Sequence, residues 1–181
     1  IDGDQGAVRH SEPDLSLRHM GQRDDGAILL VGFDGPEPTA IVGEDRIALP
    51  ANTGRIEVLG ADTQGRFYLR FPAGFFDRLI RVNEDGAEVL IASTQPIRDL
   101  KSIGDDLYVL YKAGVSWSSD DGATWSEPAG DPITCLREAS EGFYACPAND
   151  GETALSFAAS LSRDPASWLW ETSLNFNEVS S

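Results

Sequence analysis

The sequence predicts an all-β protein built from short antiparallel strands in about four repeated units. Short stretches in which apolar and polar residues alternate recur between Gly- and Asp-rich turns, a pattern that is typical of half-buried strands. No stretch of useful length has the apolar period of an amphipathic helix.

The chain is long enough for one domain with its own core. It has 181 residues and a mass of 19.5 kDa, 41% of the residues are hydrophobic, and the mean hydropathy is -0.24. Fourteen Lys and Arg stand against thirty Asp and Glu, so the net charge is -16. Phosphate backbones repel so acidic a chain, and no apolar run reaches the roughly 20 residues of a membrane helix. We therefore expect neither nucleic-acid binding nor membrane insertion.

An internal repeat begins at residues 17, 56, 97 and 133, with spacings of 39, 41 and 36 residues. Each copy starts with Leu or Ile, reaches a turn, and continues into an apolar strand. A period of about 40 residues with several short strands is typical of a β-propeller blade. We therefore predict a propeller of about four four-stranded blades, with residues 1–14 as a tail or edge strand before the domain at 15–181. The blades are expected near 15–53, 54–94, 95–130 and 131–175.

The second and third repeats show the expected strands most clearly. They are predicted at 56–62, 66–71, 76–82 and 87–92 in the second repeat, and at 97–103, 107–112, 115–119 and 124–127 in the third. Four blades could form a closed four-bladed ring or part of a larger one. A β-sandwich, which also spaces short strands regularly, is the alternative fold.

In the third repeat, residues 118–125 match Ser-x-Asp-x-Gly-x-Thr-Trp at every fixed position. This segment resembles the Asp-box, or BNR repeat, of sialidase-like propellers, where it lies away from the active site. We expect Asp120 to accept backbone hydrogen bonds across the turn, Gly122 to supply a positive φ, and Trp125 to cover the blade edge. Ser118 and Thr124 would close the hairpin on either side. All five roles are structural rather than catalytic.

Cys135 and Cys146 lie eleven residues apart around a turn at 139–142. Pairing about that turn places them opposite each other, within reach of a disulfide, and a free buried pair is the alternative. A disulfide favours an exported protein with an extracellular, periplasmic or cell-surface location. Three strings also resemble the last blade of secreted or lipoprotein BNR propellers of the myxobacterial type: Cys135-Leu-Arg, Gly142-Phe-Tyr-Ala-Cys146 and Phe176-Asn-Glu-Val179.

We predict no catalytic residue and no metal ligand. The resemblance to sialidases implies an arginine cluster, a Tyr–Glu nucleophile pair and an Asp acid/base, but the Arg-Ile-Pro motif is absent and Arg46-Ile-Ala is the nearest string. His10 and His19 fall in no metal or triad pattern. The acidic start at residues 2–6 resembles a calcium loop without its later ligands, so calcium is retained only as a third hypothesis.

A candidate binding face follows from the distribution of acidic residues. They concentrate in the turns between the first and second and between the third and fourth strands, which share one face of a propeller. The opposite face would carry the loops at 71–76 and 148–152. The candidate binding residues there are Phe75, Phe76, Asn149 and Asp150, and packing of the two phenylalanines between blades is the alternative.

We therefore expect a non-catalytic, exported scaffold without a cofactor that docks a protein or glycan through this loop face. The alternative is a fragment of a carbohydrate-active, sialidase-like glycosidase propeller. A calcium-dependent surface module that uses the acidic face is the third hypothesis. Four repeats are also compatible with a homodimer or with completion of the ring by another chain.

Overall fold

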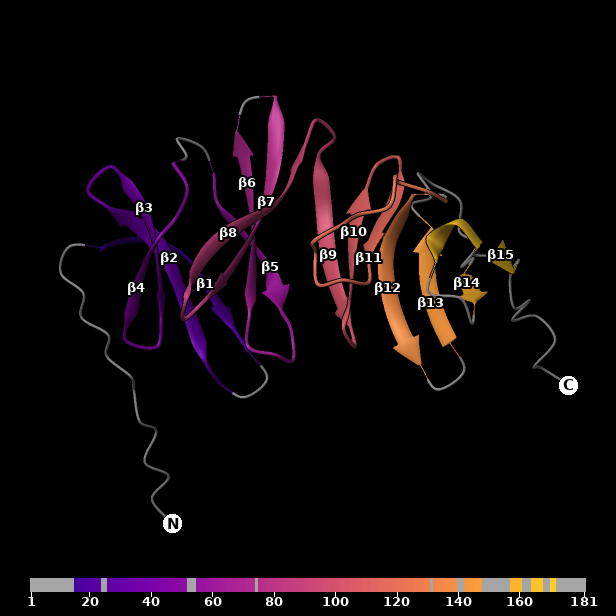
Figure 1. Ribbon diagram of the computed structural model, residues 1–181, viewed down its shortest axis with the longest axis horizontal. Coiled ribbons are helices and arrows are strands. Elements are labelled where there is room, and N and C mark those ends of the chain that lie inside the picture. Colours follow the sequence, from indigo (N-terminus) through magenta and orange to yellow (C-terminus); the bar gives the residue numbers. More distant parts are fainter. Residues whose placement is uncertain are drawn as a thin grey trace, which may run out of the picture.

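The computed structural model describes residues 15–23, 26–51, 55–73, 75–130, 132–139, 142–147, 157–160, 164–167 and 170–171. Within these residues the chain is all-β, as predicted, with four antiparallel sheets and one short 3-10 helix, η1 (Pro165–Ser167). Numbered 1 to 4 in chain order, the sheets stand in a row, with sheet 1 at one end and sheet 4 at the other (Figure 1). Over this part of the chain, no helix has the length and apolar character needed to cross a bilayer.

Each sheet takes its strands from one consecutive stretch of chain. Sheet 1 contains β1 (Leu15–Gln22), β2 (Ile28–Asp34), β3 (Glu37–Val42) and β4 (Asp45–Ala48). Sheet 2 contains β5 (Glu57–Ala61), β6 (Phe67–Ala73), β7 (Phe76–Asn83) and β8 (Gly86–Ser93). Sheet 3 contains β9 (Ile97–Ile103), β10 (Asp106–Tyr111) and β11 (Gly114–Ser118). Sheet 4 contains β12 (Ile133–Ala139), β13 (Gly142–Pro147), β14 (Phe157–Ser160) and β15 (Trp170–Glu171).

Every sheet is a meander in which strand order follows chain order. Neighbouring strands pair antiparallel, so short turns connect them. Gly35, Gly43 and Gly104 occupy such turns with φ of 59°, 63° and 59°, a left-handed conformation that glycine adopts without a Cβ clash. The Gly- and Asp-rich signals in the sequence therefore mark the real ends of strands.

A β-bulge recurs in the first strand of every sheet. The register between the first two strands shifts at Arg18 in β1, at Leu59 in β5, at Arg98 in β9 and at Thr134 in β12. In sheets 1, 3 and 4 the bulged residue is the second of the sequence repeat. A bulge bends its strand and increases its twist, so the four sheets share one local irregularity as well as one strand order.

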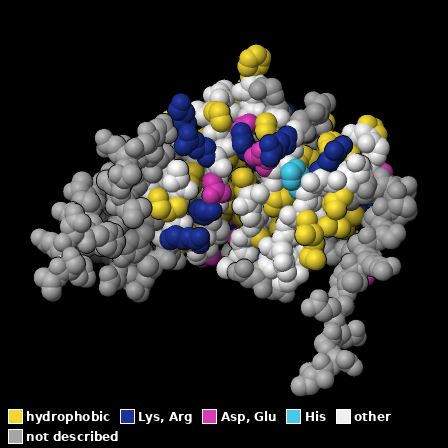
Figure 2. All heavy atoms as spheres, turned by 180° about the vertical axis from the view of Figure 1, so that it is seen from behind, with side chains coloured by type: hydrophobic (Ala, Val, Ile, Leu, Met, Phe, Trp, Pro, Cys, Tyr) yellow, Lys and Arg dark blue, Asp and Glu magenta, His cyan; other side chains and the backbone are white. Residues whose placement is uncertain are grey.

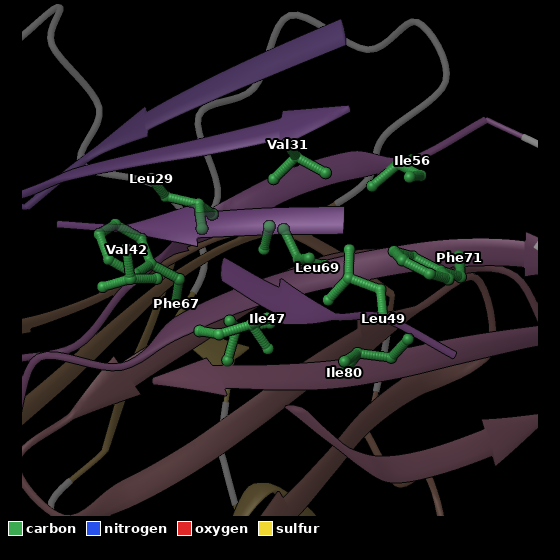
Figure 3. Close-up of a cluster of buried hydrophobic side chains, with 12 residues drawn as sticks. Leu29, Val31, Val42, Ile47, Leu49, Ile56, Phe67, Leu69, Phe71 and Ile80 are labelled. Atoms are coloured by element: carbon green, nitrogen blue, oxygen red, sulfur yellow. The ribbon is translucent and has the colours of Figure 1, made fainter. Parts of the chain in front are cut away.

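Sheets 1 and 2 bury a common apolar core between them (Figure 3). Strand β2 contributes Leu29 and Val31, and strand β6 contributes Phe67, Leu69 and Phe71, all fully buried. Side chains alternate along a strand, so these residues occupy one face of each sheet and leave the other face free for a different neighbour.

Two further cores continue the series toward sheet 4. Between sheets 2 and 3, Tyr68 and Leu79 pack against Leu107 and Val109. The core between sheets 3 and 4 consists of buried residues from both sheets: Ile103, Tyr108, Leu110, Val115, Ile133, Leu136 and Ala145. Strand β10 is buried along its whole length because it supplies side chains to both of these cores.

The first strands of successive sheets also contact one another: β1 with β5, β5 with β9, and β9 with β12. At the first of these contacts, a Cβ on Gly21 would lie 2.9 Å from Val58 Cγ1, so glycine permits the close approach. Sheets 1 and 4 lie at opposite ends of the row, and the described residues do not close into a ring (Figure 1). The stacked antiparallel meanders are thus established for the described residues, and the propeller, closed or open, stays a prediction.

Sheet 3 lacks the fourth strand that was predicted at 124–127. In its place, residues 124–130 run beside β11 with one isolated bridge, Val115 to Ala129. The Ser126 N–H donates to the Trp117 carbonyl (2.9 Å), but the Trp117 N–H donates to Ser126 Oγ (3.0 Å) rather than to its carbonyl. The Ser126 carbonyl accepts from Ser116 Oγ instead (2.6 Å), so the regular ladder is interrupted here. Pro128 has no N–H to donate, which prevents a continuous ladder at this edge.

Sheet 4 is joined by a disulfide between Cys135 and Cys146, which pair directly across the β12–β13 hairpin as predicted. Their Cα atoms are 5.0 Å apart. Leu136 and Ala145, the next pair, face the core with sheet 3. The disulfide therefore lies on the face of sheet 4 that points away from the rest of the row.

We predict that the Cys135→Ser/Cys146→Ser double variant loses about 2–3 kcal/mol of unfolding free energy, because the crosslink no longer restricts the unfolded chain. Denaturant unfolding without reductant measures the loss. Reductant should bring the wild-type chain to the same midpoint and leave the double variant unchanged. Equal midpoints for both proteins without reductant would contradict this prediction.

Candidate functional site

Residues 118–125 form a tight turn, here called the 118–125 turn, that is closed by its own side chains. Asp120 Oδ1 accepts hydrogen bonds from Ser118 Oγ and from the Thr124 N–H, both at 2.9 Å, and its Oδ2 accepts from Thr124 Oγ1. Ser118 Oγ accepts from the Gly122 N–H at 2.8 Å. Gly122 has φ of +84°, and Trp125 Nε1 donates to its carbonyl at 3.0 Å. The turn thus engages all five residues of the motif.

The hydrogen bonds also determine the charge state of Asp120. The Thr124 hydroxyl, the Thr124 N–H and the Ser118 hydroxyl together hold the pKa of this carboxyl below its usual range. An acid with this environment stays ionised and is occupied within its own turn. Asp120 is therefore suited to holding the turn and unsuited to transferring protons at neutral pH.

Asp121, the next residue, connects sheet 3 to sheet 2. It has a φ of 60°, and its side chain is about half exposed. Arg66 Nη1 donates to Asp121 Oδ1, Arg81 Nη1 lies 2.8 Å from Oδ2, and Arg81 also donates to the Asp121 carbonyl at 2.9 Å. Arg81 Nε donates in turn to Glu88 Oε1 at 2.6 Å. Two arginines of sheet 2 thus bind one aspartate of sheet 3.

Asp62 anchors this network inside sheet 2. Its buried carboxylate accepts from the Gln64 N–H (2.9 Å), the Arg66 N–H (3.0 Å), Arg66 Nε and the Tyr68 hydroxyl (2.8 Å). Burial opposes ionisation, but the bonds from Arg66 and Tyr68 outweigh it, so the pKa of Asp62 is lowered. Burial, and then the bond to Asp62, raise the pKa of Tyr68. We call Asp62, Arg66, Arg81 and Asp121 the Asp121 cluster.

The turns on the side of the row that carries the 118–125 turn link the first three sheets to one another. Arg23 Nη1 donates to the Gly65 carbonyl at 2.7 Å, and its guanidinium lies 5.8 Å from the centre of the Phe67 ring. Gln64 Nε2 donates to Asp105 Oδ1 at 3.1 Å. A hollow of about 470 Å³ opens beside these contacts. Its lining residues are Arg23, Thr63, Gln64, Gly65, Arg66, Asn83, Glu84 and Asp85.

The other side of the row, away from the 118–125 turn, carries two exposed aromatic residues. Phe75 is 90% exposed at the β6–β7 turn, and its neighbour Phe76 is also exposed, so neither packs between sheets. Asn149 and Asp150, the other candidate binding residues, lie outside the described residues. The structure therefore shows how two of these four residues are placed and does not describe the others.

A groove of about 430 Å³ lies between the outer strand of sheet 2 and residues 125–128 beside sheet 3. Leu90, Ile91 and Trp125 supply its apolar lining, while Thr94 and Glu127 are exposed polar residues of its wall. The indole ring of Trp125 is held in place by its bond to Gly122, so the groove has a fixed aromatic wall. Its size is within the usual range for a small-ligand site.

Nothing in the described part of the chain is arranged for metal binding, since it contains no group of three His, Cys, Asp or Glu that could hold an ion. Two arginines lie beside the Glu57 carboxylate and form ion pairs there. Arg70 pairs with Glu57 (3.0 Å) and with Asp77 (2.8 Å), and Arg55 pairs with Glu57 (3.2 Å).

No protein-family model matches the chain, and no curated protein matches its sequence. The site is therefore interpreted from its own geometry.

We predict that stability falls in acid partly through Asp62. A carboxyl whose pKa is lowered by folding contributes stability above its unfolded pKa, about 3.9, and loses it as the pH falls through the folded value. Asp62→Asn should lower the unfolding free energy at pH 7 by about 3 kcal/mol, because Arg66 loses its buried partner, and should flatten the decline below about pH 4. Denaturant titrations at several pH values measure both effects. Thr63→Ala, in the same turn, is the control, and an unchanged acid slope in Asp62→Asn would contradict the assignment.

We predict a smaller loss for Asp121→Asn, about 1 kcal/mol, because asparagine tolerates the positive φ and removes only the charge that both arginines bind. The loss should shrink at high salt, since the Asp121 carboxylate is half exposed. Chemical denaturation at low and high salt measures it. Glu84→Gln removes an exposed charge from a nearby turn and is the matched control. Equal effects of the two substitutions would show that Asp121 does not connect the sheets.

Proposed function

We propose that this chain is an open segment of a β-propeller that acts as a non-catalytic, exported scaffold and docks a protein or a glycan. The serial stacking of antiparallel meanders, the bulge shared by all first strands, and the contacts between successive first strands support the propeller assignment. The hydrogen bonds of the 118–125 turn are those expected of an Asp-box, which supports the resemblance to BNR propellers.

The exposure of Phe75 is the observation that carries the binding proposal. Strands β6 and β7 pair from Phe67 and Val82 up to Ala73 and Phe76, so a long, regular hairpin presents this ring to solvent. A large aromatic side chain on a rigid support loses little conformational entropy when it is buried by a partner, which is why such residues often dominate binding energy. The β6–β7 tip is therefore the preferred docking point.

The state of the charged groups favours binding over glycoside hydrolysis. A glycosidase needs two carboxyl groups flanking an open substrate site, one of them able to give up a proton. Asp62 and Asp120 are instead saturated with internal hydrogen bonds, and Arg55 and Arg70 share Glu57. The Cys135–Cys146 disulfide supports export, because such crosslinks persist in oxidising compartments.

We predict that Phe75→Ala and Phe76→Ala weaken binding at least tenfold without changing the melting temperature, since both side chains are exposed in the free protein. Titration against a panel of neutral and acidic oligosaccharides and against surface proteins from the same cells measures this. Val89→Ala, another exposed apolar residue on sheet 2, is the matched control. Turnover of a fluorogenic glycoside by the wild-type chain, or equal binding by the Phe75 variant, would contradict the proposal.

A further inference from the structure

The surroundings of the β6–β7 tip are basic, although the chain as a whole is acidic. Four segments of sheets 2 and 3 lie at the level of the tip, namely residues 55–58, 70–78, 92–98 and 110–115. They have a net charge of +3, whereas the whole chain has a net charge of -16. Five basic residues and two acidic ones make up this charge: Arg55, Arg70, Arg78, Arg98 and Lys112 against Glu57 and Asp77.

A hydrogen bond and strand pairing bring sheet 3 to the tip. Asp77, in the β6–β7 hairpin, accepts a hydrogen bond from the Ile97 N–H at 2.7 Å. The start of β9 therefore lies against this hairpin, and Ile97 also pairs with Tyr111 at the end of β10. Arg98 and Lys112 directly follow these two residues of sheet 3, and both are exposed. Two accessible cations of sheet 3 thus lie on the same side of the row as the aromatic pair.

The two carboxylates near the tip are already bound to arginine. Arg70 pairs with both Glu57 (3.0 Å) and Asp77 (2.8 Å), and Arg55 also pairs with Glu57 (3.2 Å). Asp77 is moreover buried. The two exposed cations of sheet 3 have no carboxylate partner among the described residues. A molecule that reaches the tip therefore meets positive charge that the described residues do not neutralise.

The turns at the other ends of the same strands have the opposite charge. Residues 62–66, 83–86, 104–106 and 119–122 contain seven carboxylates and one arginine. Figure 2 shows Lys and Arg side chains gathered mainly over the upper half of one face of the molecule, and Figure 1 places the β6–β7 turn at the top. An acidic partner is therefore repelled from one side of the row and attracted to the side on which Phe75 projects.

The aromatic pair narrows the chemistry of the partner further. Phe75 is 90% exposed and Phe76 is 49% exposed. Unlike Tyr or Trp, Phe has no polar atom with which to hydrogen-bond a sugar hydroxyl, so burial of these rings gains most from apolar side chains. Carboxylates alone would satisfy the cations and leave the rings in water. The tip thus favours a partner that combines both kinds of side chain.

We propose that the β6–β7 tip docks an acidic segment of a partner protein. Apolar side chains of that segment cover Phe75 and Phe76, and its carboxylates lie beside Arg98 and Lys112. Charge complementarity speeds the encounter and excludes basic partners, while burial of the rings supplies most of the affinity. This inference rests on the proposed function, since it names the partner of the same docking point.

Selection of short random peptides displayed on phage, with the wild-type chain as target, tests this chemistry. Enriched peptides are expected to combine Asp or Glu with apolar residues and to lose at least tenfold in affinity for Phe75→Ala. Their binding should weaken at high salt, because exposed charges are screened. Arg98→Gln and Lys112→Gln should each weaken it about threefold. Arg137→Gln, which removes an exposed arginine of sheet 4, is the matched control and should bind like the wild-type chain.

The outcomes separate this inference from the proposed function. Enriched peptides that lack acidic residues, or that ignore salt and both substitutions in sheet 3, would overturn the acidic partner, yet docking at the tip stands if Phe75→Ala still abolishes binding. Uronate oligosaccharides that bind the tip when no enriched peptide does would overturn it in favour of a glycan. If Phe75→Ala affects neither class of ligand, the proposed function itself fails. Thermal melts establish that each variant is folded, and because Arg98 and Lys112 are both exposed, either variant alone decides the question.

Discussion

The burial of both faces of the middle sheets is the constraint on which the rest of this structure depends. Phe67 and Leu69 of β6 point toward sheet 1, whereas Tyr68 between them points toward sheet 3. Strand β10 is likewise apolar on both sides and buried throughout. A sheet with two apolar faces requires a neighbour on each, so the sheets must stack in series. The row and its three cores both follow from this requirement.

Apolar packing alone does not determine how stacked sheets are turned relative to each other, because it has little directional preference. The hydrogen bonds between turns along one side of the row supply that direction. Asp121 binds Arg66 and Arg81 of the preceding sheet, and Gln64 binds Asp105 of the following one. Two acidic residues of these turns, Asp105 and Asp121, thus hold neighbouring sheets together. Phe75 projects on the opposite side of the row, where we propose that it contacts other molecules.

Much of the fold could be predicted from the sequence because its signals are local. Gly- and Asp-rich turns such as Asn83–Gly86 determine where strands end, and the turn length alone places Cys135 opposite Cys146. The hydrogen bonds within residues 118–125 are also local, so the motif predicts them. The Asp121 cluster was not foreseen, because Arg66 and Arg81 belong to a different repeat and their charges look like those of any exposed strand. The missing fourth strand of sheet 3 depends on Ser126 and Pro128, whose effects compete with an otherwise strand-like pattern.

Hydrogen–deuterium exchange of the backbone amides, read by mass spectrometry, tests serial stacking most directly. The informative peptides cover β2, β6 and β10, the second strands of sheets 1, 2 and 3. If the sheets stack in an open row, β6 and β10 should exchange slowest, because their sheets are covered on both faces, and β2 should exchange faster. Equal protection of β2 would mean that sheet 1 is also covered on both faces, and would contradict the open row.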